Sequence, residues 1–409
     1  MTYDVIIVGG SFAGLAVASQ LRGKMLLIEP YKIGEHQTSA CGTPLGVPKG
    51  LGLMDSVLQV HRELVLHTRN TTVVVDVSET PFCTFDYRRF CNGMAEAVNA
   101  EILRAHVLGR EGRKIVTDRG SFVGEILVDA LGWRSILENQ REGFDRRRRL
   151  MNFGIETVAP RKGDKLCFWF DPGAFPRGIA WFFPVGNGSR IGVASYVEEN
   201  RLAPPLELFL ESMGLVRKET HGGYFPAALQ AATMGDIFKV GDAAGQCLPL
   251  TGEGIRPAIY FGQACGSVIQ EILDGGITLE DGLKKYRELV IKHQRIYRAL
   301  WLAQWLAANL PPQLATFLLL LACRENFLSY IRPRYMRFAD PKGLKPVPKE
   351  MRNRREGEIG ATPEAAILYR SEGDKKAARD PLRGIEGSEK RGREPVKHLG
   401  GEEVHAGGW

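Results

Sequence analysis

The stretch "YDVIIVGGSFAGLAVASQLRGKMLLIEP", residues 3–30, determines the class of fold. It opens with four consecutive β-branched residues, 5–8, a pattern typical of a strand buried on both faces. A glycine-rich turn follows, then a helix of small and apolar residues, and then a second apolar strand over residues 25–28. A strand, turn, helix and strand of this length predict a nucleotide-binding half of a Rossmann-like α/β domain.

The turn indicates the class of ligand. The template G-x-G-x-x-G reads here as GGSFAG, so Ser11 replaces the second glycine with another small residue. Glu29 closes the second strand, where a carboxylate can accept hydrogen bonds from ribose hydroxyls. The N–H groups at the start of the helix would face the phosphates. The candidate binding residues here are Gly9, Ser11, Phe12, Ala13, Gly14 and Glu29. The turn predicts a dinucleotide without deciding between NAD and FAD.

Two later fragments extend the same domain. The first, "EILVDALGWRS" at 125–135, has a short apolar strand with Asp129 at its exit. The second, "DIFKVGDAAGQCLPLTGEGIRPAIYFGQACG" at 236–266, has a strand, then the pair Gly241-Asp242, and a helix that begins near Gly254. Such a second element is needed by a flavin: the carboxylate binds a ribityl hydroxyl, and the helix start at Gly254 and Ile255 faces the N1–O2 edge of the ring. We therefore predict FAD as the cofactor.

Strands of another kind lie between these fragments. Residues 165–171, 178–186 and 189–197 are aromatic and β-branched and are separated by Gly and Asn turns, a pattern that favours antiparallel strands of a second domain. The predicted fold class is α/β, with a Rossmann-like FAD-binding domain assembled from separated segments, an inserted β-rich substrate domain and a C-terminal helical region. The predicted parts are 1–75, 76–145 (with a short insertion) and 236–275 for FAD, 146–235 for the substrate domain, 276–340 for the helices and 341–409 for a disordered charged tail.

Composition restricts the function classes. The seven cysteines are scattered and include no C-x-x-C pair, which favours a reducing compartment and argues against a zinc site or a disulfide framework. We find no basic region followed by an apolar one at the start of the chain, so we expect a cytoplasmic protein without a secretory signal. The net charge is +7, but the only dense basic run is 146–149 and no nucleic-acid-binding motif surrounds it. We expect no metal and no nucleic acid.

These motifs together carry a resemblance. "VGGSFAG", "DALG" and "GDAAGQCLPLTGEGI" resemble flavoproteins with the p-hydroxybenzoate hydroxylase-like fold, and most of all the geranylgeranyl reductase family. "ACGTPLG" at 40–46 is similar to the Cys-Gly segment of that family, and "IAWFFPVGNGSRIGVA" at 179–194 is similar to its Tyr-x-Trp-x-Phe-Pro…Gly-x-Gly motif. Ile179 stands in place of the Tyr, and Ala194 in place of the last Gly. The resemblance covers roughly residues 3–270.

The resemblance implies an FAD enzyme that reduces isolated double bonds of a hydrophobic isoprenoid, such as the geranylgeranyl groups of archaeal lipids, chlorophyll precursors or quinones. It places Cys41 and Gly42 beside the flavin, with Cys41 as a candidate catalytic residue; a buried inert cysteine is the alternative. It also places an arginine of "FDYRRFCNG" on the flavin nucleotide, with Arg88 as the candidate and Arg89 as the alternative. Trp181, Phe183 and Pro184 would wall the substrate cavity, unless they are simply core of the β-rich domain. Thr43-Pro44, where the family often has Glu-Gly, leaves the acceptor open.

Other functions stay open at this stage. One is a flavin-dependent monooxygenase or halogenase on the same fold, and another is a flavin-bound cyclase or electron-transfer partner that uses FAD structurally. The electron donor is either NADPH or a ferredoxin. Residues 299–323 carry no charge but are interrupted by Pro311-Pro312, which predicts two helices. These helices either pack on the core, lie on a membrane surface as a peripheral contact, or span the membrane. The oligomeric state is not predicted.

Overall fold

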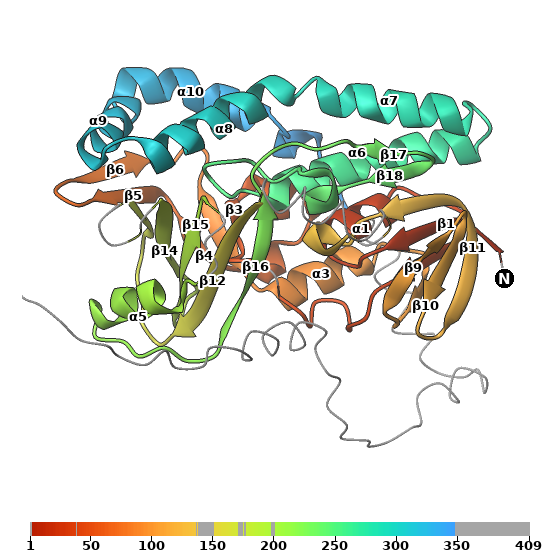
Figure 1. The fold of residues 1–409 in the computed structure, drawn as a ribbon, viewed down its shortest axis with the longest axis horizontal. Helices are drawn as coiled ribbons and strands as arrows, with labels where there is room; N and C mark the ends of the chain where they lie inside the picture. The colour runs from red at the N-terminus through yellow and green to blue at the C-terminus, as the bar shows by residue number, and fades with distance from the viewer. Residues whose placement is uncertain are drawn as a thin grey trace, which may run out of the picture. The chain divides into compact units, whose positions relative to one another are not determined.

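The computed structural model describes residues 2–37, 39–135, 137, 151–170, 175, 177–197 and 201–347. The basic run 146–149 and the chain from residue 348 onward lie outside these described residues. The described part has two large sheets, with helices α7 to α10 along the upper side of the view in Figure 1.

The first sheet is built on five parallel strands. Their order is β8-β2-β1-β11-β18, with β17 antiparallel to β18 at the end. The hairpin β9–β10 folds back onto β11. The bounds are β1 Thr2–Val8, β2 Met25–Ile28, β8 Glu101–Leu103, β9 Val107–Glu111, β10 Lys114–Thr117, β11 Gly120–Asp129, β17 Thr233–Met234 and β18 Ile237–Lys239. The three strands expected from the three sequence fragments are therefore neighbours, and the predicted Rossmann-like domain is confirmed.

Both faces of β1 are covered, which explains its continuous apolar run. Val5 and Ile7 pack with α1 (Phe12–Ala18) and α6 (Ile255–Leu273). Ile6 and Val8 pack on the other face with residues of the β9–β10–β11 meander. Close contact between α1 and α6 depends on small residues, since a Cβ at Gly262 would lie 2.7 Å from the carbonyl oxygen of Ala13. α7 (Leu279–Ile291) packs outside α6.

The second sheet has seven strands in the order β16-β12-β15-β14-β13-β5-β6. Its bounds are β5 Glu63–Thr68, β6 Thr72–Asp76, β12 Met151–Ala159, β13 Leu166–Phe170, β14 Gly178–Pro184, β15 Ser189–Ser195 and β16 Thr220–Pro226. β12 to β16 pair antiparallel, as the aromatic pattern predicted. One face packs against α5 (Ala203–Glu211). We call the opposite face, which carries Phe168, Ile179, Trp181, Phe183, Ala194 and Phe225, the site face.

The domain assignment needs one correction. β5 and β6 fall within residues 1–75 or at their edge, which we expected to belong to the FAD-binding domain, yet they extend the second sheet. β5 pairs in parallel with β13, about a hundred residues further along the chain. Their apolar alternation identifies them as strands, but a parallel pairing over such a separation leaves no local signal in the sequence.

A small third sheet adjoins the first sheet and α3. It consists of β3 (Gly42–Pro44), β7 (Phe82–Phe85) and β4 (Val57–His61), in that order. α2 (Gly46–Leu51) follows β3, and α3 (Tyr87–Ala95) follows β7. Asp86 caps α3 by accepting a hydrogen bond from the backbone N–H of Arg89 at 2.9 Å. The Cys-Gly segment is thereby fixed between the sheet and the helix.

The uncharged C-terminal stretch forms two helices, as predicted. α8 (Gln294–Asn309) ends before the proline pair, α9 (Pro312–Ala322) begins at its second member, and α10 (Glu325–Arg337) follows. Within the described residues, no single helix is long and apolar enough to cross a membrane; α9 together with the helical stretch after it meets the length and composition test only as a pair bent by 77°.

The expected start of the tail at residue 341 is too early. Pro341 and Leu344 are buried, and a Cβ at Gly50 of α2 would lie 2.7 Å from the carbonyl oxygen of Pro341. Val347 is also buried and donates its backbone N–H to the carbonyl of Leu51 at 3.1 Å. Three apolar side chains spaced three residues apart are enough to dock this polar-looking segment on the body.

Candidate functional site

The glycine turn after β1 is shaped by close backbone contacts. Gly9 has a φ of +109°, and a Cβ there would lie 2.2 Å from the carbonyl oxygen of Ala130. A Cβ at Gly14 would lie 1.9 Å from the carbonyl oxygen of Gly9, so α1 rests directly on the turn. The Oγ of Ser11 lies 3.0 Å from the hydroxyl of Tyr87 on α3. The first and last glycines are therefore required sterically, whereas Ser11 is held by α3.

Glu29 lies against this turn. Its Oε2 accepts the backbone N–H of Gly10 at 2.8 Å, and its Oε1 accepts that of Tyr31 at 3.3 Å. Burial raises the pKa of Glu29, and the two backbone donors oppose the rise because they stabilise the charged form. The structure thus brings together the carboxylate and the turn that the sequence pattern paired.

Two members of the turn face the protein core. The ring of Phe12 packs edge-on against the rings of Tyr87 and Phe90, and its side chain is buried. Ala13 contacts the third fragment, since a Cβ at Gly241 would lie 2.8 Å from the Cβ of Ala13. Only backbone groups of Phe12 and Ala13 are therefore available to a ligand, and the first and third fragments touch at this point.

Asp242 is a carboxylate with an unusual environment. It lies in the short helical turn after β18, and Gly254, the residue that caps the start of α6, is close to it: a Cβ at Gly254 would lie 3.8 Å from Oδ1 of Asp242. Burial raises the pKa of Asp242 to about 6. Within the described part of the chain, no hydrogen bond or ion pair to this carboxylate is found. A half-buried carboxylate without a protein partner is suited to accept a hydroxyl from a ligand.

The loop between Asp242 and α6 is held by groups from other elements. Leu250 has a φ of +65°, and its backbone N–H donates to Oε1 of Gln304 on α8 at 2.8 Å. Its carbonyl accepts the hydroxyl of Tyr196 at 2.7 Å. Gln304 also pairs through its amide with Asn152 of β12, at 3.0 and 3.2 Å. The C-terminal helix thus fixes the shape of the loop, a role that the sequence analysis did not predict for Gln304.

The Cys-Gly segment meets the aromatic strand. Cys41 is buried in the left-handed region (φ +57°), and its Sγ donates to the carbonyl of Ser39 at 3.2 Å. Burial raises the pKa of its thiol far above the usual range, so the thiol is protonated at neutral pH. A Cβ at Gly42 would lie 2.9 Å from the ring of Phe183, so only a glycine allows this approach.

Trp181 and Phe183 belong to the site face. Both are half-buried, whereas Phe182 between them is buried in the core under α5. Pro184 is buried, and its carbonyl accepts the Oγ1–H of Thr84 at 2.5 Å. The site face is also close to the loop between Asp242 and α6, since a Cβ at Gly252 in that loop would lie 3.6 Å from the ring of Phe225. The aromatic strand, the Cys-Gly segment and the loop after Asp242 therefore converge.

The candidate arginine lies at the edge of this region. Arg88 is exposed on the first turn of α3. Its backbone packs on Gly34, which has a left-handed conformation: a Cβ added at Gly34 would lie 2.8 Å from the Cα of Arg88. Arg89 is also exposed, and its backbone N–H serves the cap of α3. Neither side chain has a hydrogen-bonded or charged partner among the described residues. The assignment of Arg88 to a phosphate stays a prediction.

Sequence reasoning missed a buried charged group on the site face. Glu156 of β12 and Arg190 of β15 are buried, and His221 of β16 contacts Glu156. A charged residue at an inward position of an apolar strand was the available signal, in "GIETVA" and "SRIGVA". Recognising the cluster required the strand register, which places these residues side by side.

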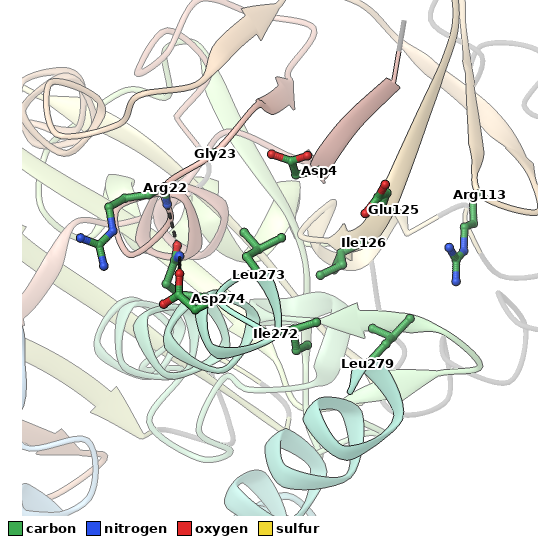
Figure 2. Close-up of a pocket in the computed structure, with 11 residues that line it drawn as sticks. Asp4, Arg22, Gly23, Arg113, Glu125, Ile126, Ile272, Leu273, Asp274 and Leu279 are labelled. Carbon is green, nitrogen blue, oxygen red and sulfur yellow. Dashed lines mark hydrogen bonds between the residues drawn. The ribbon is translucent and has the colours of Figure 1, made fainter. Parts of the chain in front are cut away.

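A cavity lies elsewhere in the described part of the chain. It has a volume of about 580 Å³. Asp4, Arg22, Arg113, Glu125 and Asp274 are among the residues that line it (Figure 2). It lies at the start of β1 and the end of α6, at the opposite end of the parallel strands from the glycine turn. Its polar groups are partly satisfied internally, since Asp4 accepts the backbone N–H of Lys24 at 2.8 Å. Ligands of open α/β sheets bind at the other, carboxyl end. Among the described residues no group of His, Cys, Asp or Glu could hold a metal ion.

Known proteins resemble this chain over part or most of its length. No family model matches the chain. An uncharacterized protein of Methanosarcina barkeri is 25% identical over 338 residues, which is 76% of this chain and 85% of that one. Digeranylgeranylglycerophospholipid reductase 1 of Methanopyrus kandleri is 33% identical over 145 residues, which is 32% of this chain and 39% of the reductase. The resemblance to the geranylgeranyl reductases is confirmed. The match spans only about two-fifths of that named reductase, so its activity is not transferred by this similarity alone.

Solved structures establish the fold of this chain. A geranylgeranyl bacteriochlorophyll reductase-like protein of Thermoplasma acidophilum matches with a TM-score of 0.71 at 20% identity, covering 79% of this chain and 92% of that one. The flavin-dependent brominase Bmp2 matches with a TM-score of 0.61 at 14% identity, covering 88% of this chain and 99% of that one. The fold is therefore shared with a reductase-like protein and with a flavin-dependent brominase, and the site must decide between such functions.

Proposed function

We propose that this protein is an FAD-dependent oxidoreductase that reduces carbon–carbon double bonds of a geranylgeranyl or other polyprenyl group. The observation that carries the proposal is the convergence of the Cys-Gly segment, the loop after Asp242 and the aromatic site face. Gly42 of the Cys-Gly segment packs against the ring of Phe183, which links that segment directly to the site face. An apolar, aromatic wall beside the expected flavin suits a substrate that has no polar handle at its reacting bond.

The residues present fit FAD. The turn from Gly9 to Gly14 accepts no additional Cβ at either end, as a pyrophosphate-binding turn requires. Glu29 would accept the ribose hydroxyls, and the unpartnered Asp242 would accept a ribityl hydroxyl. The backbone N–H groups at the start of α6, a helix of 19 residues, would face the flavin ring. Arg88 would contact the nucleotide from outside.

The side chains of the protein have separate roles in the reaction. When bound in its reduced form, FAD supplies the hydride. Trp181 and Phe183 hold the alkene in a water-poor space, which fixes its distance and orientation. The thiol of Cys41, kept protonated by burial, delivers a proton to the second alkene carbon. The electron donor that reduces the enzyme is NADPH or a ferredoxin, and reduction kinetics with each separates the two.

We also propose a cytoplasmic, peripheral position on a lipid surface. None of the residues of α9 is buried, and large apolar side chains are exposed across α8 to α10: Trp301, Leu302, Trp305, Leu314, Phe317, Leu321, Phe327 and Tyr330. Arg324 and Arg334 are exposed beside them. An exposed apolar patch with flanking arginines fits the headgroup boundary of an anionic membrane, where a polyprenyl lipid substrate resides.

The test is an anaerobic single turnover. Dithionite-reduced holoenzyme is mixed with digeranylgeranyl lipid, prenylated quinone or a geranylgeranylated chlorophyll precursor, and products are analysed by mass spectrometry. We expect gains of two hydrogens per turnover with at least one substrate, together with reoxidation of the flavin. If no substrate gains hydrogen, and an aromatic compound instead stimulates oxygen uptake by the enzyme, the monooxygenase or halogenase function replaces this proposal.

A further inference from the structure

Four residues form a row across four neighbouring strands of the second sheet. His221 of β16 is opposite Glu156 of β12, and Glu156 is opposite Gly192 of β15. Gly192 is in turn opposite Trp181 of β14. Because directly opposed residues in a sheet share a face, all four lie on the site face.

Glu156 is the centre of this row. Its side chain is only 4% exposed, and its Oε2 accepts the indole N–H of Trp181 at 3.1 Å. Its Oε1 lies 2.8 Å from Nε2 of His221 and 3.5 Å from Nη1 of Arg190. A desolvated carboxylate is retained only where such donors compensate the lost hydration. The donors come from three different strands, so the cluster depends on the tertiary fold.

Gly192 makes the arrangement sterically feasible. A Cβ at this position would lie 2.2 Å from the Trp181 ring and 2.6 Å from the carbonyl oxygen of Ile155. The indole therefore lies close against the backbone at Gly192, and its N–H donates to Glu156. The glycine matched to the Gly-x-Gly part of the motif thus has a physical role: it lets the tryptophan reach the carboxylate.

The row is connected to the loop that carries Cys41. Nε2 of Gln37 donates to the carbonyl of Ser39 at 2.8 Å and lies 3.5 Å from Oε1 of Glu156. The same carbonyl of Ser39 accepts the Sγ–H of Cys41. Burial is the main cause of the raised pKa of the Cys41 thiol; the charge of Arg190 opposes the rise, and Glu156, Cys91 and Asp86 add to it.

Exposure falls steeply from His221 to its neighbour Glu156 in the row. The His221 side chain is 34% exposed, whereas Glu156 next to it is 4% exposed. Protons from solvent can therefore reach the imidazole and pass to a buried carboxylate at hydrogen-bond distance. Arg190 is also nearly buried, and its Nε–H has no hydrogen-bond partner among the described residues. That donor points to an acceptor absent from the protein itself, such as a water or a polar group of the substrate.

We propose that His221 and Glu156 supply the proton consumed in the reduction, and that Glu156 positions Trp181 and the Cys41 loop for it. This inference rests on the proposed function. One alkene carbon receives the hydride from the reduced flavin, and the other receives the proton as the S–H bond of Cys41 breaks and a C–H bond forms. The Cys41 thiolate regains its proton from the Glu156–His221 pair, and His221 takes up one from solvent. The two electrons of the hydride originate in the external donor that reduces the flavin.

The variants for the test are Glu156→Gln and His221→Gln, which place an amide of similar size at each position but cannot carry a proton at this row. His67→Gln is the matched control, because His67 lies on β5 of the same sheet and stacks on Trp169 on the opposite face. The FAD content, the melting temperature, and the rate of flavin reduction by dithionite establish that a variant is folded and loaded. Substrate-dependent reoxidation is then followed in H2O and in D2O across pH.

We expect both variants to bind FAD and to be reduced like the parent protein, while reoxidation by a prenyl substrate slows about 10²-fold with a larger solvent isotope effect. The control should match the parent. Unchanged reoxidation in both variants overturns the proposal, and so does an equal loss of FAD binding and of both half-reactions, since that indicates a structural role.

A second readout does not need turnover. The indole ¹H–¹⁵N signal of Trp181, assigned with Trp181→Phe among the six tryptophans, should change position with pH in the parent protein but not in His221→Gln. If the parent protein reduces no prenyl substrate but the indole signal shows this His221-dependent change, the proposed function fails while the proton route stands. If the indole does not respond to His221, the route is refuted whatever the substrate.

Discussion

The pH dependence of FAD binding tests the role of Asp242 directly. Burial raises the pKa of its carboxyl from 3.8 to about 6, so the folded apoprotein protonates this group as pH falls below that value. A ribityl hydroxyl that donates to the carboxylate favours the charged form. FAD should therefore bind more tightly as pH rises from 5 to 7, by up to about tenfold per pH unit below the pKa.

In the apoprotein, stability changes with pH in the opposite direction from FAD affinity. Because the folded-state pKa lies above the unfolded-state value, the folded state binds more protons between pH 4 and 6, and stability is lost as pH rises through that window. The ionised carboxylate costs at most about 3 kcal/mol above the window. Asp242→Asn removes this cost, so the apo variant should melt at a higher temperature than the apo parent at pH 8.

Loss of the charged acceptor should nonetheless weaken FAD binding. A hydrogen bond to a charged group contributes about 1.5–3 kcal/mol, or roughly tenfold to a hundredfold in affinity. Quenching of FAD fluorescence by apoprotein at pH 5, 6, 7 and 8 measures both the loss of FAD affinity in the variant and the pH dependence of that affinity. Asp274→Asn is the control, since Asp274 is exposed at the other end of α6. Any remaining pH dependence in the Asp242 variant reports Glu29, whose pKa is also raised. An Asp242→Asn protein with the parent's affinity and pH profile refutes the assignment.

Three further outcomes follow from the packing. Gly192→Ala should cost about 1–3 kcal/mol and displace the indole of Trp181, so turnover should fall more than FAD content; unchanged turnover would contradict the contact seen. Deleting residues 348–409 should leave the melting temperature unchanged, whereas deleting 341–409 should lower it by several degrees, and equal effects of the two deletions would contradict the docking of the intervening segment. Phe317→Ser, at a side chain 58% exposed, should weaken cosedimentation with anionic vesicles about tenfold while leaving FAD content unchanged; equal sedimentation of the two proteins would argue against the lipid contact.

Much of the fold follows from local patterns. The run at residues 5–8, the glycine turn and the strand ending at Glu29 are contiguous, so their chemistry and spacing predict a single unit. The helix that begins after Gly254 is similarly marked by its preceding Pro-Gly loop, and the structure begins α6 at Ile255. These elements are predictable because each is determined by residues close together in the sequence.

The features that were missed depend on long-range geometry. β5 joins β13 by a parallel pairing that neither strand encodes locally. Glu156 and His221 are 65 residues apart and become partners only because β12 and β16 pair in one register. A shift of that register by one residue would turn one of the two side chains to the face under α5. Gln304 is a polar residue in an uncharged stretch, and its local sequence gives no sign that it fixes the loop at Leu250.

Helices α8 and α10 contact the loop between Asp242 and α6 or the start of α6, and they also carry exposed apolar side chains. On α8, Gln304 and Ala308 face inward, to the loop and to the site face, while Trp301 and Trp305 are 42% and 49% exposed on the other side. α10 is attached to the start of α6 by Arg256, which is fully buried, donates to Glu253 and also reaches the backbone carbonyls at the end of α10. A lipid surface that contacts these helices would therefore act on the same residues that shape the loop beside Asp242. If the substrate enters from such a surface, membrane contact and the geometry of the reacting centre are coupled through α8 and Arg256, and vesicles that bind the protein should change the flavin absorption spectrum of the holoenzyme even without substrate.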